Sequence, residues 1–269
     1  MKIKRGEIKD RAKERAAEEK IFNFKTQINK LEIENFNNNI KLEIEYSDTL
    51  PHMVLDTAIL HFVKFTENNN ILKITLDTAA LRVYEDQQKA LDELNNQKNN
   101  GGFLRNSTRY ESYAVEDGYS TYHATIYIPC LSGIQSYECS NIEINTYKNN
   151  QLKPIQIDLD GSTLNLNYID VVSDSLGNET HITQKVVPQI TAIQKNSSTL
   201  KFSNFRNIPL HLTLINNYFE FENYDSEDSE YGYTQKEFLY KDMVIKYDKY
   251  SDINFNLSEM KKIKLIPLD

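Results

Sequence analysis

Apolar and polar side chains alternate through most of the chain after residue 20, most clearly in segment 153–168. In this segment, KPIQIDLDGSTLNLNY, apolar residues occupy alternate positions on both sides of Asp160-Gly161. An Asp-Gly pair favours the two-residue turn of a β-hairpin, because both turn positions require a positive φ. Pairing outward from the turn places Ile157 opposite Leu164 on a buried face and the Gln, Asp, Thr and Asn side chains on a wet face. The segment therefore predicts an antiparallel hairpin.

The same alternation predicts three more hairpins in the first half of the chain. Their loops are 37–39, 67–70 and Asp117-Gly118, and each loop is rich in residues that tolerate positive φ. In the third, His123 is expected on the polar face of a strand that ends before Pro129. After residue 151, short strands recur every eight to twelve residues with no alternation of strands and helices. That spacing is typical of a sandwich or a barrel.

Two stretches have a helical pattern instead. Residues 77–98 are rich in helix-forming residues, and Asp77 or Thr78 provides an N-cap, so we expect a helix near 78–97. Residues 1–20 carry charges of alternating sign and almost no apolar stripe. They predict a charged helical or disordered arm, and a docking segment and a solvated tail are equally compatible with this pattern.

These elements define the expected fold class and domains. We predict a mainly β protein with two antiparallel β-sandwich-like units, one inserted helix and a charged N-terminal helical arm. The chain has 269 residues, near the upper size of a single core. A polar interruption at 148–151 sets the expected boundaries at 1–20 for the arm, 21–150 for a β-rich domain with the helix, and 151–269 for a second β-sandwich-like domain.

Composition excludes some classes of partner. The formal net charge is −8, which argues against general binding to nucleic acid or to anionic lipid surfaces. No apolar run is long enough to span a membrane, and the first twenty residues lack the apolar core of a signal peptide. We therefore expect either synthesis in the cytoplasm or a truncated surface ectodomain.

Several segments were considered for chemistry. Asp158 to Ser162 resembles the start of a calcium loop, but Leu164 and Leu166 stand where later ligands belong, so no metal site is expected. The acidic, aromatic tract 218–233 suits a hard cation or a basic partner, although a solvated hairpin tip explains it better. The two cysteines, Cys130 and Cys139, are compatible with a disulfide or with two thiols.

The five histidines show no metal-ligand spacing, and no motif for nucleophilic catalysis or phosphate binding occurs. We therefore assign no catalytic, cofactor or metal residue and predict a protein that is not an enzyme. The expected function is structural or interaction-based, docking in a larger assembly such as a bacterial surface complex or a phage particle. Protein partners are expected, through residues 1–20 among other surfaces, and homo-oligomerisation is left open. Two alternatives are an extracellular sensory or ligand-binding module of a regulatory membrane protein, and a carbohydrate-active hydrolase with a carboxylate pair between the two units.

Overall fold

The fold is built almost entirely from β-strands. The computed structural model describes residues 19–36, 40–99, 122–146, 154–168, 171–173, 179–181, 189–203, 208–220, 240–254 and 263–268. This part of the chain contains one α-helix, and its remaining regular structure is strand apart from a single 3₁₀ turn. The prediction of a mainly β protein with one inserted helix is therefore confirmed.

Two large sheets contain most of the strands. Sheet A has seven strands, in the spatial order β1 (Glu19–Asn23), β4 (His52–Asp56), β7 (Tyr122–Ile128), β3 (Ile40–Tyr46), β9 (Ser140–Thr146), β11 (Thr163–Tyr168) and β15 (Thr199–Ser203). Sheet B has nine, in the order β20 (Ile263–Pro267), β18 (Tyr240–Tyr247), β16 (Ile208–Ile215), β14 (Ile190–Lys195), β10 (Ile155–Asp160), β8 (Gly133–Tyr137), β2 (Lys30–Glu34), β6 (Ile71–Leu76) and β5 (Val63–Asn68).

The smaller elements complete the described structure. Two short pairs are formed by β12 (Val171–Ser173) with β13 (Glu179–His181) and by β17 (Tyr218–Glu220) with β19 (Asp252–Asn254). The 3₁₀ turn η1 (Thr57–Ile59) precedes β5, and the helix α2 (Thr78–Asn99) follows β6.

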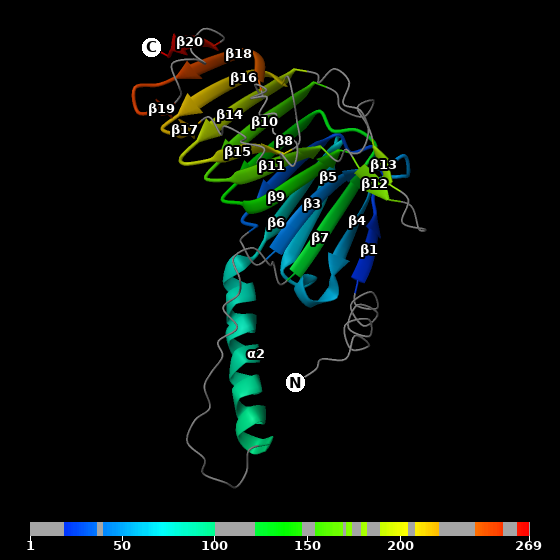
Figure 1. Ribbon diagram of the computed structural model, residues 1–269. Helices are drawn as coiled ribbons and strands as arrows, with labels where there is room; N and C mark the ends of the chain where they lie inside the picture. The colour runs from blue at the N-terminus through cyan, green and yellow to red at the C-terminus, as the bar shows by residue number, and fades with distance from the viewer. Residues whose placement is uncertain are drawn as a thin grey trace.

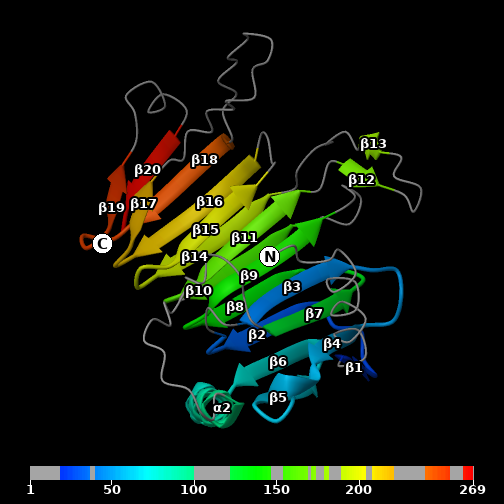
Figure 2. The same ribbon diagram turned by 60° about the horizontal axis from the view of Figure 1, so that its bottom comes forward.

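The chain winds between the two sheets as a β-solenoid. A strand of sheet B is followed by a strand of sheet A in β2–β3, β8–β9, β10–β11 and β14–β15. Neighbouring strands from successive coils are parallel, as in β8 with β10 and β9 with β11. The two sheets face each other and the coils stack along one direction (Figures 1 and 2). Each coil therefore buries its apolar face only against its neighbours and the opposite sheet.

The stacking order differs from the chain order at the N-terminal end. The coil of β6, α2 and β7 lies outside the coil of β2 and β3, and the chain then crosses back to place β8 and β9 on the other side. Antiparallel strands border this end, because β5 pairs with β6 and β4 pairs with β7. Antiparallel pairing here ends the succession of parallel coils.

The prediction of antiparallel sandwich units is wrong in its strand pairing. β10 and β11 do not pair with each other; β10 lies in sheet B and β11 lies in sheet A. Gly161 has a positive φ of 58°, and Asp160 does not, so the turn is a corner between sheets and not a type I′ hairpin. The same correction applies to β2 and β3, which flank residues 37–39 and also lie in different sheets.

One predicted hairpin is confirmed. β5 and β6 pair in antiparallel fashion around Asn69 and Asn70, whose φ angles of 45° and 67° are both positive. This is the φ combination that a type I′ turn requires. β5 is one of the two edge strands of sheet B. The hairpin expected around Asp117-Gly118 lies outside the described residues.

The predicted helix is also confirmed, with Asp77 as its N-cap. The carboxylate Oδ1 of Asp77 accepts a hydrogen bond from the Ala80 N–H at 3.1 Å. Leu81 is buried, and the Tyr84 ring lies 5.4 Å from the Phe62 ring between centroids. The first turns therefore pack on the sheets, and the remaining turns extend away from them (Figure 1). Residues 1–18 of the expected arm lie outside the described residues, and its last two residues belong to β1.

Apolar side chains from both sheets form one buried cluster. The alternation predicted the inward positions correctly: Ile157 and Leu164 are 2% and 0% exposed, while His123 is exposed. Parallel register aligns the inward residues of sheet B in a row, namely Leu72, Leu31, Ile134, Ile157, Ala192, Leu212, Ile245 and Leu265. Strands on both sides of residues 148–151 contribute to the same two sheets. Independent folding of 21–150 and 151–269 stays a prediction.

Engineered disulfides distinguish the solenoid from the hairpin. Asn165 and Lys201 are register partners in sheet A, so Asn165→Cys with Lys201→Cys should form a disulfide under mild oxidation. The hairpin register would instead place Asn165 opposite Gln156, and Asn165→Cys with Gln156→Cys should stay reduced. Peptide mass mapping of the oxidised, folded chains measures both. A disulfide in the second pair and none in the first would contradict the parallel arrangement.

Candidate functional site

Tight corners connect strands of sheet B to strands of sheet A, and one more connects β16 to β17 of a two-stranded sheet. At the corners after β2, β8, β10, β14 and β16, a residue in the left-handed region is followed, directly or after one more residue, by a buried side chain. The left-handed residues are Asn35, Glu138, Gly161, Asn196 and Asn216. The corner after β14 contains one extra left-handed residue, Ser197. The buried residues are Phe36, Cys139, Ser162, Ser198 and Asn217.

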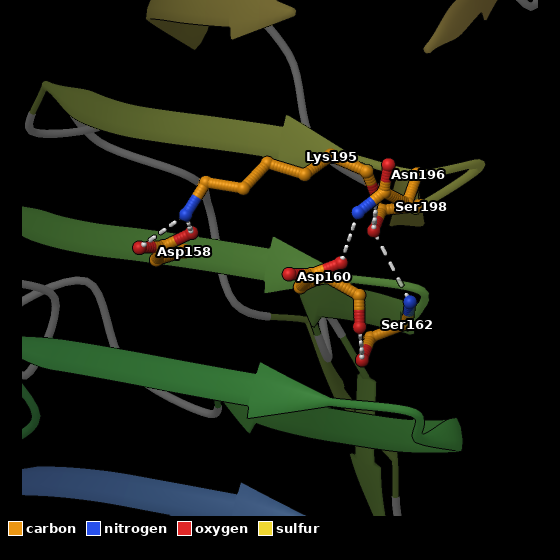
Figure 3. A network of polar contacts seen from close by, with 6 residues as sticks. All are labelled: Asp158, Asp160, Ser162, Lys195, Asn196 and Ser198. Carbon is orange, nitrogen blue, oxygen red and sulfur yellow. Dashed lines mark hydrogen bonds and ion pairs between the residues drawn. The ribbon is translucent and has the colours of Figure 1, made fainter. Parts of the chain in front are cut away.

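Most of these buried residues are polar, and they link one coil to the next. We call Cys139, Ser162, Ser198 and Asn217 the corner column. The Cys139 N–H donates to Ser162 Oγ at 3.1 Å. The Ser162 N–H donates to Ser198 Oγ at 3.1 Å (Figure 3). The Asn217 amide Nδ2 then donates to the Ser198 carbonyl oxygen at 2.9 Å. Side chains of the next coil thus satisfy backbone amides that have no strand partner.

A second set of contacts runs along the outside of the corners. Asn196 Nδ2 donates to Asp160 Oδ1 at 2.7 Å, and Asn216 Nδ2 donates to Asn196 Oδ1 at 3.1 Å. The Asn216 N–H donates to both carboxylate oxygens of Asp248, at 3.2 and 3.1 Å. A hydrogen bond from the Ser251 hydroxyl, reinforced by backbone N–H groups, lowers the pKa of Asp248.

Asp158 and Asp160, the residues considered for calcium, are occupied by other contacts. The Lys195 ammonium lies 2.8 and 3.1 Å from the two Asp158 oxygens, and Asp160 accepts from Asn196 (Figure 3). Across the described part of the chain, no group of three or more His, Cys, Asp and Glu side chains is arranged to hold a metal ion. Both carboxylates thus link β10 to residues at the end of β14.

The outer face of sheet A carries charged and polar rows. Glu43 of β3 and Glu143 of β9 are direct register partners, and the Lys41 ammonium lies 2.7 Å from Glu43 and 2.9 Å from Glu143. Burial disfavours the charged form of Lys41, but hydrogen bonds to both carboxylates outweigh it and raise the pKa of this lysine. Next to this group, the rings of His52 and Tyr127 stack with centroids 4.5 Å apart.

The outer face of sheet B contains a hollow of about 410 Å³ near the beginning of β2, β8, β10 and β14. Its lining combines one cation, two amides and two hydroxyl groups with two apolar residues: Lys30, Gln156, Gln189, Ser132, Thr191, Pro154 and Ile155. The sequence pattern does not single out these residues, because they come from segments far apart in the chain. The alignment of parallel coils is what brings them together.

The other residues singled out from the sequence are dispersed. Cys130 and Cys139 are free thiols, so the disulfide alternative is excluded. His61 is exposed in the turn between η1 and β5, although the sequence placed it inside a strand, and His123 is exposed on β7. His211 contacts the side chain of Gln189. Of the acidic tract, only Tyr218–Glu220 falls within the described residues, where it forms β17. In the same described part, no helix combines the length and apolar character needed to cross a membrane.

The corner column should contribute measurably to stability. Ser198→Ala would leave the buried Ser162 N–H without its acceptor, so we expect a loss of about 1–3 kcal/mol in the free energy of unfolding. Thr199→Ala removes an exposed hydroxyl beside it and is expected to cost far less. Urea titrations followed by circular dichroism measure both. Equal effects of the two substitutions would contradict the column's role.

The Cys139 thiol gives a pH dependence with a definite sign. Burial raises its pKa to about 11 from an ordinary value of 9.0, so the unfolded chain releases this proton at lower pH than the folded chain. The stability from this group is present below pH 9 and is lost as the pH rises through about 11, a change of roughly 2–3 kcal/mol. Between pH 8 and pH 10.5, the free energy of unfolding measured in urea should fall more for the wild type than for Cys139→Ala. Cys130→Ala is the control, and its free energy of unfolding should fall as much as that of the wild type.

Comparisons with known proteins give only weak likenesses. No protein-family model and no curated protein matches the chain. Among solved structures, candidate adhesins from Parabacteroides merdae and Parabacteroides distasonis match with TM-scores of 0.29 and 0.30 and identities of 8% and 10%. These matches cover 93% of this chain and 92% and 93% of those chains. A candidate cell adhesion protein from Clostridium sporogenes matches with a TM-score of 0.31 and 9% identity, covering 93% of this chain and 99% of that one. TM-scores this low support no functional argument, so the function proposed below is argued from this chain's own residues.

Proposed function

We propose that this chain is a non-catalytic interaction protein that presents the outer face of sheet A to a protein partner in a larger assembly. The observation that carries the proposal is the fixed register of the outward side chains. β3, β7, β9, β11 and β15 are parallel neighbours, so the outward residues of one strand stand beside those of the next. Such a surface is rigid before it binds, which lowers the entropy lost on association.

Charge indicates the kind of partner. Carboxylates outnumber lysines on the outer face of sheet A. The outward carboxylates of β1, β3, β4 and β9 are Glu19, Glu43, Glu45, Asp56 and Glu143, and the outward lysines of β3 and β15 are Lys41 and Lys201. Lys41 is already held between two of the carboxylates. An acidic surface of this kind favours a partner with a basic surface.

A bacterial surface complex or a phage particle is the proposed setting, and a sensory or ligand-binding ectodomain is the second candidate. Both use a rigid binding face and neither needs catalysis. A hydrolase has less support, because the lining of the hollow on sheet B contains no carboxylate that could act as an acid or a base. The buried Cys139 thiol, with its raised pKa, is not an activated nucleophile.

Charge reversal on one face tests the proposal. The tagged full-length chain would be expressed in its source cells, crosslinked, purified and weighed by native mass spectrometry. We expect a complex heavier than one chain, and we expect Glu45→Lys on sheet A to reduce its yield by at least about tenfold, equivalent to 1.4 kcal/mol. Glu32→Lys makes the same charge change on the outer face of sheet B and should leave the yield unchanged.

Two results would overturn this assignment. One is a single chain that never associates in the source cells at any concentration tested. The other is an equal effect of the two substitutions, which would show that sheet A is not the binding face. Circular dichroism of both variants confirms that each remains folded.

A further inference from the structure

The hollow on sheet B lies on a different surface from the proposed protein interface and has its own chemistry. One outward row of sheet B runs through Lys30, Gly133, Gln156 and Thr191, which are successive register partners on β2, β8, β10 and β14. Adjacent strands stand about 4.8 Å apart. Gly133 leaves a gap in this row between the lysine and the glutamine.

The Lys30 stem lies over this gap. A Cβ built on Gly133 would be 3.6 Å from Lys30 Cγ and 3.6 Å from the Gln156 carbonyl oxygen, which are ordinary contact distances. The φ of Gly133 lies outside the left-handed region, so neither strain nor crowding requires glycine here. What glycine provides at this position is room for the Lys30 stem, which covers it.

Lys30 differs from Lys73 and Lys195, two other lysines on the outer face of sheet B. Lys73 lies 2.6 Å from Glu34 and Lys195 lies 2.8 Å from Asp158, so each has a carboxylate partner. Within the described residues, Lys30 has no carboxylate within 4.0 Å, and the lining of the hollow contains none. One uncompensated cation therefore stands among neutral hydrogen-bonding groups, in a protein whose net charge is −8.

The neutral groups suit hydroxyl groups in a ligand. The side chains of Gln156 and Gln189 and the hydroxyl of Thr191 each offer a donor and an acceptor. The Ser132 hydroxyl donates to the Asn29 carbonyl oxygen at 3.0 Å, which leaves its oxygen available as an acceptor. Pro154 adds an apolar contact at the rim, whereas the Ile155 side chain is buried in the core.

We propose that this hollow binds an acidic sugar, with the sugar carboxylate against Lys30 and its hydroxyls against Gln156, Gln189 and Thr191. An acidic peptide fits less well. β2, β8, β10 and β14 are all interior strands whose backbone groups are bonded to neighbours on both sides, so an added peptide strand has no edge to pair with. The volume lies within the roughly 300–1,000 Å³ of small-molecule sites.

Calorimetric titration of the full-length chain with sodium D-glucuronate, D-glucose and a triglutamate peptide tests this site. We expect glucuronate to bind at least about tenfold more tightly than glucose or the peptide, because only glucuronate offers both the carboxylate and the hydroxyls. Lys30→Met keeps the stem over Gly133 and removes the charge, so it should weaken glucuronate binding about tenfold or more. Gly133→Val fills the gap with a residue suited to a strand and should also weaken it.

Lys64→Ala is the matched control, because Lys64 is an exposed lysine on β5 of the same sheet. This variant should bind glucuronate like the wild type. If Gly133→Val does not fold, as judged by circular dichroism, Gln156→Ala replaces it. Absence of glucuronate binding, equal affinity for glucose, tighter binding of triglutamate, or an unchanged Lys30→Met variant would each overturn the proposal. None of these results bears on the sheet A interface, which is tested separately by charge reversal there.

Discussion

The hydrogen bonds of the corner column are the constraint on which the rest of the structure depends. Where the chain passes from sheet B to sheet A, its backbone amides leave the strand ladder and enter the interior, where water does not reach them. Ser162 and Ser198 provide acceptors for the amides of the preceding coil, at 3.1 Å in both cases. A buried amide without an acceptor costs about 1–3 kcal/mol, comparable with the benefit of burying one aliphatic side chain. The corners therefore determine which coil stacks on which, and the apolar core, which has no directional preference, only determines that they stack.

This register also creates the surface. Once the corners are aligned, the outward residue at each position has fixed neighbours on both sides, whether or not their charges are compatible. Glu43 and Glu143 become direct partners in this way, and like charges directly opposite each other destabilise a sheet. The Lys41 ammonium between them offsets that repulsion. On sheet B the same alignment places Lys30, Gln156 and Thr191 in one outward row along the hollow. The two proposed binding surfaces are thus consequences of one stacking rule.

The sequence predicts the local features of this fold better than its topology. Alternation identified the buried face of β10 and β11, and capping chemistry identified Asp77 at the start of α2. Alternation does not specify which strand lies alongside, because an antiparallel hairpin and a parallel coil bury the same positions. The difference lies in the turn. Asn69 and Asn70 both have a positive φ, and the chain reverses there within one sheet. At the other corner only Gly161 has a positive φ, and the chain continues into the other sheet. Asp-Gly is compatible with either outcome, so this residue pair does not decide between a hairpin and a corner.

The residues of the hollow could not be predicted either, because alternation does not specify which strands are neighbours. A signal for them nevertheless exists. Each residue of the outward row is the fifth residue before a left-handed corner residue; the row is Lys30, Gly133, Gln156 and Thr191.

The edge strand β20 indicates why binding through faces is more consistent with this structure than binding through edges. The Leu268 N–H donates to the Tyr247 carbonyl oxygen at 2.7 Å, so the backbone groups of Leu268 face β18 and those of Pro267 face away from it. Proline has no N–H, and its nitrogen therefore stands where an added strand would need a donor. Lys264 is exposed on the same strand, and a charge there further disfavours edge-to-edge pairing. At the opposite end of sheet B the parallel coils give way to antiparallel β5. Addition of strands is thus opposed at the β20 edge, whereas the outward rows of both sheets present charged and hydrogen-bonding groups to a partner or a ligand.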